Sequence, residues 1–148
     1  IMSAEAMEAA VAILEPHLKG AQAEKKARVV IGTVKGDIHD LGKNIVIALL
    51  KVNGFEVFDL GRDVAPATFV DKAIELNAQI VGLSGLLTTT MPMMKEVIQI
   101  MKDDGVRQRF KVIIGGGPTS QAYADQIGAD GYGEMAQHAV DLCNRLVA

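Results

Sequence analysis

Hydrophobic positions along the chain follow two patterns that alternate from residue 28 onward. Short apolar runs, most of them rich in Val and Ile, are each followed by a longer stretch in which apolar residues recur at helical spacing. Such alternation predicts parallel strands connected by helices that cover both faces of a sheet. We therefore expect an α/β, doubly wound, flavodoxin-like (Rossmann-like) fold. Its five predicted strands lie at residues 28–33, 56–60, 80–84, 111–114 and 129–132.

Local signals set the ends of the first two predicted helices. The first is expected over residues 41–53, because Gly54 can take the left-handed conformation that closes a helix. Pro66, with its preset φ, suits the first turn of the second helix. The residues expected to face the sheet from these two helices are Ile45, Val46, Leu49, Leu50, Phe69, Val70, Ala73 and Ile74.

Three further helices follow in the predicted order. The third is expected over residues 91–104, Ser120 is a candidate N-cap of the fourth, Gly128 ends it, and Glu134 opens the last. Cys143 lies on the apolar face of this last helix, which favours a buried thiol over a nucleophile.

Residues 1–20 stand apart from this alternation. Met7, Val11, Leu14 and Leu18 form a helical stripe before any strand begins. Residues 21–26 are polar and Ala-rich, which is typical of a linker or a helix tail. We therefore expect an N-terminal helix and linker at residues 1–27 and one domain at residues 28–148.

Composition narrows the classes of function. With 148 residues, the chain fits one ordinary domain. It has no apolar run approaching the roughly 20 residues of a membrane span, and its net charge of -3 offers no general attraction for nucleic acid or acidic lipid. We expect neither partner. The single cysteine excludes an internal disulfide and favours a cytoplasmic setting.

The stretch at residues 35–42 is too long and too charged for a minimal connection between a strand and a helix. Asp37 and His39 lie two positions apart, so the carboxylate could hold one ring nitrogen while the other binds a metal. A histidine hydrogen-bonded only for structure remains the alternative. His17 and His138 lie in predicted helices away from this loop, so a single protein ligand would suit a metal already held by a macrocycle.

At residues 37–42, the sequence DIHDLG resembles the DxHxxG motif of cobalamin-binding domains. Ser84-Gly85-Leu86 resembles the SxL motif of this family, and residues 115–117 resemble its GG motif. The three motifs follow predicted strands in the order of the family, and the resemblance covers residues 28–148. GDIHDLGKNIV and VGLSGLLTTTMP are most similar to corrinoid proteins of methanol, methylamine and betaine methyl transfer and to the B12 module of methionine synthase.

The resemblance implies a role for each matching residue. His39 would be the lower axial ligand of cobalt, Asp37 would hold its ring, and Thr90 would extend this hydrogen-bond relay in place of the serine of methionine synthase. Ser84 and Thr88 would bind the displaced nucleotide tail of the cofactor in a slot. The implied cofactor-binding residues are Asp37, His39, Asp40, Gly42, Ile45, Ser84, Leu86, Thr88, Thr90, Gly115, Gly116, Gly117, Tyr132 and Gly133.

Several residues keep two interpretations. Gly115, Gly116 and Gly117 could admit the tail to the backbone or form a flexible turn, and residues 131–133 could close the slot or form an ordinary turn. Lys35 and Lys43 could steer the phosphate of the tail, although solvated side chains are the preferred interpretation. Met94 is expected in the core, and Met91 stays open.

The resemblance also implies a function. The chain would be a non-catalytic carrier of cobalamin, present as methylcobalamin in turnover. It would shuttle methyl groups between a substrate-specific methyltransferase and a second methyltransferase that serves a thiol or tetrahydrofolate, with a reductive activator as a further partner. Asp37 would also manage the proton that accompanies binding and release of His39.

Three other functions share parts of this pattern. The small subunit of an adenosylcobalamin mutase has the same three motifs, and a B12-sensing regulatory module would present the same domain. Residues 2–19 resemble the last helix of the helical cap bundle that precedes the domain in methyl carriers, which favours the carrier. A flavodoxin-like signalling domain without corrinoid would leave the charged loop and the three motifs unexplained.

Overall fold

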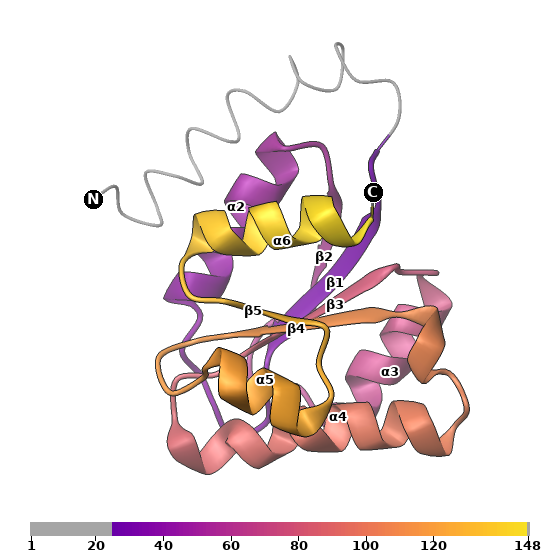
Figure 1. Cartoon of the computed structure of the whole chain (residues 1–148), viewed down its shortest axis with the longest axis vertical. Helices are drawn as coiled ribbons and strands as arrows, with labels where there is room; N and C mark the ends of the chain where they lie inside the picture. The colour runs from indigo at the N-terminus through magenta and orange to yellow at the C-terminus, as the bar shows by residue number, and fades with distance from the viewer. Residues whose placement is uncertain (1–24, 148) are drawn as a thin grey trace.

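In residues 25–147, which the computed structural model describes, five parallel strands form a sheet with helices on both faces (Figure 1). The strand order is β2-β1-β3-β4-β5, which is the order of flavodoxin-like doubly wound folds. The predicted fold class is therefore confirmed. The strands are β1 (Arg28–Thr33), β2 (Glu56–Asp59), β3 (Ile80–Ser84), β4 (Lys111–Gly115) and β5 (Gly131–Gly133).

Helices α2 and α6 pack together on one face of the sheet, and α3, α4 and α5 cover the other (Figure 1). Short 3-10 turns at Thr88–Thr90 and Arg107–Arg109 precede α4 and β4, and neither was expected from the sequence. Within the described residues, no helix is long and apolar enough to cross a membrane. The helices are α2 (Leu41–Val52), α3 (Pro66–Glu75), α4 (Met91–Asp103), α5 (Gln121–Ile127) and α6 (Ala136–Leu146).

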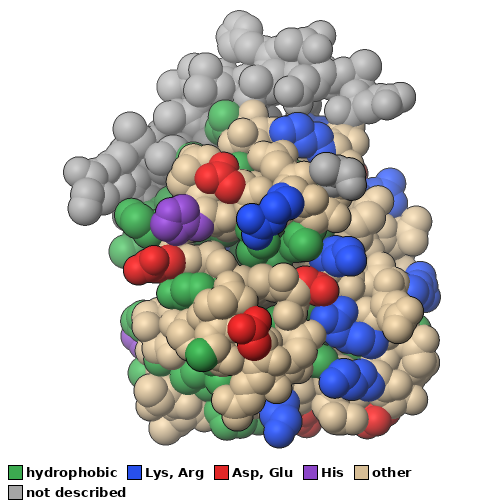
Figure 2. All heavy atoms as spheres, viewed as in Figure 1, with side chains coloured by type: hydrophobic (Ala, Val, Ile, Leu, Met, Phe, Trp, Pro, Cys, Tyr) green, Lys and Arg blue, Asp and Glu red, His purple; other side chains and the backbone are tan. Residues whose placement is uncertain are grey.

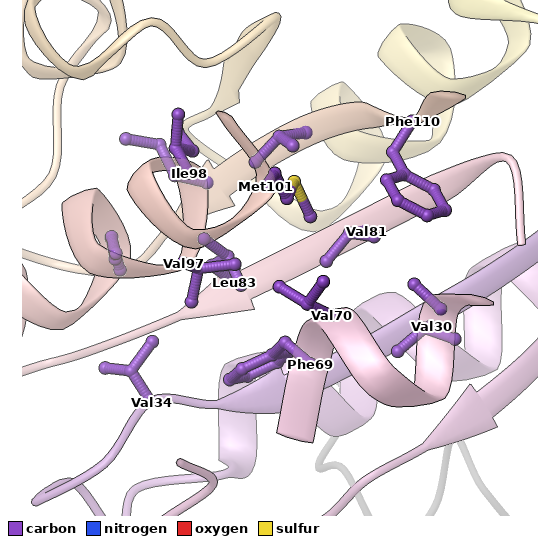
Figure 3. Packing of buried hydrophobic residues seen from close by; sticks show 14 of the residues in the cluster. Val30, Val34, Phe69, Val70, Val81, Leu83, Val97, Ile98, Met101 and Phe110 are labelled. Atoms are coloured by element: carbon purple, nitrogen blue, oxygen red, sulfur yellow. The ribbon is translucent and has the colours of Figure 1, made fainter. Parts of the chain in front are cut away.

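Alternating strand residues divide the core between the two faces. Val30, Val81 and Val112 are neighbours across β1, β3 and β4, and they pack beneath α3 and α4. Figure 3 shows Phe69 of α3 and Met101 of α4 closing over this row. Residues one position along each strand point to the opposite core under α2 and α6, as the period of two requires. Both faces of the sheet are thus buried, which parallel sheets need.

The predicted helix ends largely agree with the structure. The Ser120 hydroxyl accepts a hydrogen bond from the Tyr123 N–H at 3.1 Å, which confirms the N-cap of α5. Gly54 and Gly128 have φ values of 91° and 82° after α2 and α5, as expected for helix-ending glycines. Cys143 is fully buried, and burial raises the pKa of its thiol to about 12, so the buried-thiol interpretation is confirmed.

Four details of the prediction were wrong. Ile74 is 38% exposed because it lies about 100° around α3 beyond Ala73, at the edge of the buried stripe. Ile45 lies outside the core of α2 and α6, where Ile47 and Ala48 are buried instead. The fifth strand begins at residue 131 and not at residue 129. The last helix, α6, begins at residue 136 and not at Glu134.

The expected helix at residues 1–20 and most of the linker that follows it lie outside the described residues. Residues 25–27 lead into β1, where Ala27 is buried against the core of α2 and α6. The first strand of the sheet therefore begins immediately after this short segment.

Candidate functional site

The loops after β1, β3, β4 and β5 meet at the carboxyl edge of the sheet, where a slot of about 370 Å³ opens. Such an edge is the usual ligand site of a doubly wound sheet, because β1 and β3 are neighbours whose connections run to opposite faces. Seven of the expected site residues line the slot: Gly42, Ser84, Gly115, Gly116, Gly117, Tyr132 and Gly133.

The depth of the slot comes from a glycine in the central strand. Gly82 lies in register between Ile31 of β1 and Ile113 of β4, and all three residues line the slot. A Cβ at Gly82 would stand 3.1 Å from the Ile31 side chain. The missing side chain therefore leaves room between two isoleucines. Our sequence interpretation missed this residue, although a glycine inside a buried strand is itself a signal of close approach.

Asp37 and His39 form the hydrogen-bonded pair that their spacing predicted. The ring Nδ1 of His39 lies 2.8 Å from Asp37 Oδ1, and the His39 backbone N–H donates to the same oxygen at 3.0 Å. A carboxylate can only accept, so Nδ1 carries the proton and Nε2 carries the lone pair. The His39 side chain is 47% exposed. This arrangement presents one imidazole nitrogen as a ligand.

The second oxygen of Asp37 is bound from the loop after β3. The backbone N–H groups of Leu86 and Leu87 donate to Asp37 Oδ2 at 2.6 and 3.1 Å. Burial of the carboxyl group acts to raise its pKa, but hydrogen bonds from His39, Leu86 and Leu87 outweigh it and hold the pKa of Asp37 well below its usual value. Asp37 is therefore a fixed anion that orients the ring, and it does not store a proton at neutral pH.

Thr90 is the hydroxyl residue expected beside Asp37, and the structure confirms this contact. Its Oγ1 lies 3.1 Å from Asp37 Oδ2 and 2.8 Å from the Leu87 carbonyl oxygen, so its single proton can serve either acceptor. Thr90 is 5% exposed. By contrast, Leu86 and Thr88 are exposed and lie outside the slot that they were expected to line. The turn at Thr88–Thr90 directs Thr90 inward and leaves Thr88 on the surface.

In the loop after β4, position 116 requires glycine for structural reasons. Gly116 has a φ of 122°, and a Cβ there would collide with the carbonyl oxygen of Gly85. The Thr119 hydroxyl donates to the Gly116 carbonyl at 2.5 Å and holds the turn. Gly116 is thus required by the approach of two loops, whatever ligand is bound. The alternative of a flexible turn does not describe this braced loop.

The prediction that the Lys43 side chain is solvated was wrong. It is 2% exposed, lines the slot, and donates from Nζ to Asp59 Oδ1 at 2.7 Å. It was misjudged because a lysine near the start of a helix normally reaches water, whereas β2 lies against this turn of α2. Lys35 is exposed, as expected.

The remaining expected residues have smaller roles in the structure. Asp40 precedes α2 without a side-chain capping bond, and its Oδ2 lies 3.8 Å from Arg62 Nε. Ile45 is half-buried and does not line the slot. Met94 is fully buried, which confirms its place in the core, and Met91 is half-buried above Tyr123, whose hydroxyl donates to its carbonyl at 2.8 Å.

The mouth of the site carries exposed apolar side chains. Of the six exposed large hydrophobic residues found in the described chain, four lie in the loops of this edge and a fifth is the first residue of α2. Figure 2 shows Lys and Arg side chains gathered toward the right of the view, the side on which β1 begins in the same view in Figure 1. An exposed apolar group of this kind marks a binding surface. These residues are Ile38, Leu41, Leu86, Leu87 and Met135.

Comparison with known proteins identifies the family to which this site belongs. The sequence profile of the B12 binding domain matches residues 27–141. The chain is 49% identical over 148 residues to dimethylamine corrinoid protein 2 of Methanosarcina mazei, covering 99% of this chain and 69% of the relative. The chain therefore belongs to the B12-binding domain family.

Two solved structures are similar over most of the chain. A cobalamin-binding protein from Desulfitobacterium hafniense matches with a TM-score of 0.84 and 41% identity, over 98% of this chain and 68% of that one. The methanol:cobalamin methyltransferase complex MtaBC from Methanosarcina barkeri matches with a TM-score of 0.79 and 34% identity, over 89% of this chain and 50% of that one. Within its family, the chain is thus a corrinoid protein, and its cofactor is a cobalamin.

The site fits this cofactor on its own geometry. Across residues 25–147, no three His, Cys, Asp or Glu side chains are grouped to hold a bare metal ion, whereas His39 offers one nitrogen to a metal held by a macrocycle. Gly42 lines the slot, and apart from its chain neighbours and the adjacent backbone of α2, no protein atom lies within 4 Å of the position of a Cβ there. Packing within the protein therefore does not demand this glycine, but the approach of a ligand would.

Proposed function

We propose that this chain is a corrinoid carrier that holds cobalamin base-off and His-on, with His39 as the lower axial ligand of cobalt. It shuttles a methyl group between a substrate-specific methyltransferase and a second methyltransferase acting on a thiol or tetrahydrofolate. A reductive activator completes the proposed set of partners. The chain itself performs no catalytic step.

One observation carries the proposal: a fully buried Asp37 fixes the His39 ring in the loop that leads to Gly42, and Gly42 lines the glycine-rich slot. The bound corrinoid would supply a cobalt centre able to accept a methyl group and hand it on. Asp37 sets the tautomer of His39 and fixes the orientation of its ring. Ser84 and Gly115 line the slot that would take the tail of the cofactor.

The methyl-transfer part of the proposal draws on the relatives. One is a dimethylamine corrinoid protein, and one similar structure is a complex with a methanol methyltransferase. Both support a methyltransferase partner and favour the carrier over the mutase and sensor alternatives. Neither identifies the methyl donor of this chain, because the two relatives are named for different compounds, dimethylamine and methanol.

Titration of the apoprotein with hydroxocobalamin tests the proposal. We expect stoichiometric binding with an absorption change, and for His39→Ala a base-off spectrum and an affinity weakened on the order of 10- to 100-fold. His138→Ala is the matched control, because His138 is exposed on α6 and lies outside the slot. Wild-type protein that binds no cobalamin at micromolar concentration, or equal spectra for the two variants, would refute the proposal.

A further inference from the structure

The loop of residues 60–65, between β2 and α3, runs alongside the loop of residues 34–40 that carries His39. The two segments are joined as if they continued the sheet: the Thr33 N–H donates to the Gly61 carbonyl at 2.9 Å, and the Val64 N–H donates to the Thr33 carbonyl at 3.0 Å. Val34 and Val64 form an isolated parallel bridge just beyond the end of β1. The loop of residues 60–65 is thus a lateral support of the histidine loop.

Asp63 makes both hydrogen bonds that join this loop to residues 36 and 37. Its backbone N–H donates to the Asp37 carbonyl at 3.0 Å, and its carboxylate Oδ1 accepts the Gly36 N–H at 2.7 Å. Asp63 holds a φ of 53°, in the left-handed region that few residues other than glycine, asparagine and aspartate adopt readily. The backbone and side chain of Asp63 therefore hydrogen-bond to Asp37 and Gly36, the two residues before Ile38.

Asp37 orients the His39 ring, because its carboxylate Oδ1 accepts hydrogen bonds from both the ring Nδ1–H and the backbone N–H of His39. The loop after β3 holds Asp37 from one side, through its carboxylate. Asp63 holds Asp37 from the other side, through its carbonyl. A change at Asp63 would therefore reach the imidazole through Gly36 and Asp37 without any direct contact.

We propose that Asp63 is a positioning residue for His39, setting the fraction of molecules in which the imidazole is presented to cobalt. The inference rests on the proposed function, because it takes His39 as the cobalt ligand. It assigns to the loop after β2 a role in axial coordination that none of the three sequence motifs includes.

Three substitutions separate the two properties of Asp63. Asp63→Asn keeps an oxygen acceptor and tolerates the left-handed backbone; Asp63→Gly keeps only the backbone conformation; Asp63→Ala keeps neither. Asp130→Ala is the matched control. The Asp130 carboxylate accepts the Val112 N–H at 2.7 Å, the same kind and length of bond, but at the amino end of β4.

The first measurement uses the apoprotein, in which amide hydrogen exchange of residues 36–39 reports the hold of Asp63 on the loop. We expect exchange to accelerate roughly fivefold in Asp63→Gly and more in Asp63→Ala, because one hydrogen bond of this kind contributes about that factor. Asp63→Asn should stay near wild type. In Asp130→Ala, exchange should accelerate at residue 112 and not at residues 36–39.

The second measurement is the EPR spectrum of each protein loaded with cob(II)alamin. We expect the ratio of histidine-on to histidine-off signal to fall roughly fivefold in Asp63→Gly, with rescue in Asp63→Asn and no change in Asp130→Ala. Unchanged coordination in both the Gly and Ala variants would overturn the inference. If the wild-type protein itself shows no histidine signal, the proposed function is refuted. The exchange measurement on the apoprotein does not depend on that function, so it still tests whether Asp63 holds the loop.

Discussion

Asp37 lies in a place where an isolated charge would be costly, because its side chain is fully buried. The cost is offset by five donors within reach of its two oxygens: the N–H groups of His39, Leu86 and Leu87, the His39 ring and the Thr90 hydroxyl. Since the donors come from two loops, the carboxylate couples the histidine loop to the loop after β3. The ring orientation thus depends on the ionised form of Asp37.

Asp37→Asn should destabilise the apoprotein at neutral pH. The amide would turn an NH2 group toward N–H donors, leaving buried groups unpaired, and we expect a loss of roughly 2 kcal/mol in the free energy of unfolding. Urea unfolding of wild type and variant would measure it. Asp71→Asn, on the exposed side of α3, is the control and should change little.

The same pair of proteins should show a pH dependence of defined sign. The pKa of Asp37 is lowered in the folded state from an ordinary value of 3.8, so its stabilisation is present above that value and is lost as the pH falls toward the folded pKa. The difference in unfolding free energy between wild type and Asp37→Asn should therefore shrink below about pH 4. A difference that stays constant on acidification would show that the charge of Asp37 is not what stabilises the loop.

At this scale, the sequence predicted the direct pair but not its surroundings. Asp37 and His39 are two positions apart, so their contact is local. Leu86 and Leu87 contribute backbone N–H groups from 49 and 50 positions away, and backbone groups carry no sequence signal. Lys43 and Asp63 were missed for a similar reason, because each depends on the neighbouring β2 segment rather than on its own pattern.

Among the elements, the start of α2 and the loop after β4 both contain glycine for different reasons. Gly42→Ala should leave the apoprotein as stable or make it about 0.5–1 kcal/mol more stable, because Ala is the better helix former and its Cβ would meet no atom beyond its own stretch of α2. It should still weaken cobalamin binding. Gly116→Ala should destabilise the apoprotein by about 3 kcal/mol or more, through the collision with Gly85.

Thermal unfolding of both variants and titration with hydroxocobalamin would measure these effects. A Gly42→Ala variant that binds cobalamin as wild type does would contradict the close approach of the cofactor to α2. A Gly116→Ala variant of wild-type stability would mean that the loops after β3 and β4 can separate without cost.

Element positions were predictable where the pattern is long and apolar. β1 and β3 were located to the residue, because their runs of Val, Ile and Leu are bounded by charged or glycine-containing stretches. β5 was misplaced because it has only three residues and begins and ends with glycine, so its existence depends on pairing with β4. The turn at Thr88–Thr90 was missed, since three threonines favour no helical conformation.

At the scale of the whole molecule, the strand order explains why the motifs meet. β1 and β3 are adjacent, and β4 follows β3, so the loops after these three strands lie side by side at one edge (Figure 1). The sequence order of the motifs therefore predicted the location of the site. Its depth was missed: the glycine at position 82 is visible in the sequence, but its place between two isoleucines follows only from the register of β1, β3 and β4.

The central claim is that His39 replaces the base of the cofactor at cobalt. The most direct test is the EPR spectrum of the cob(II)alamin-loaded protein, prepared once with ordinary histidine and once with histidine labelled with the heavy nitrogen isotope. We predict that each line is split into a triplet by ordinary nitrogen and into a doublet by the heavy isotope, and that both splittings vanish in His39→Ala. A triplet that persists in the labelled protein would mean that the base of the cofactor remains bound, and would contradict the claim.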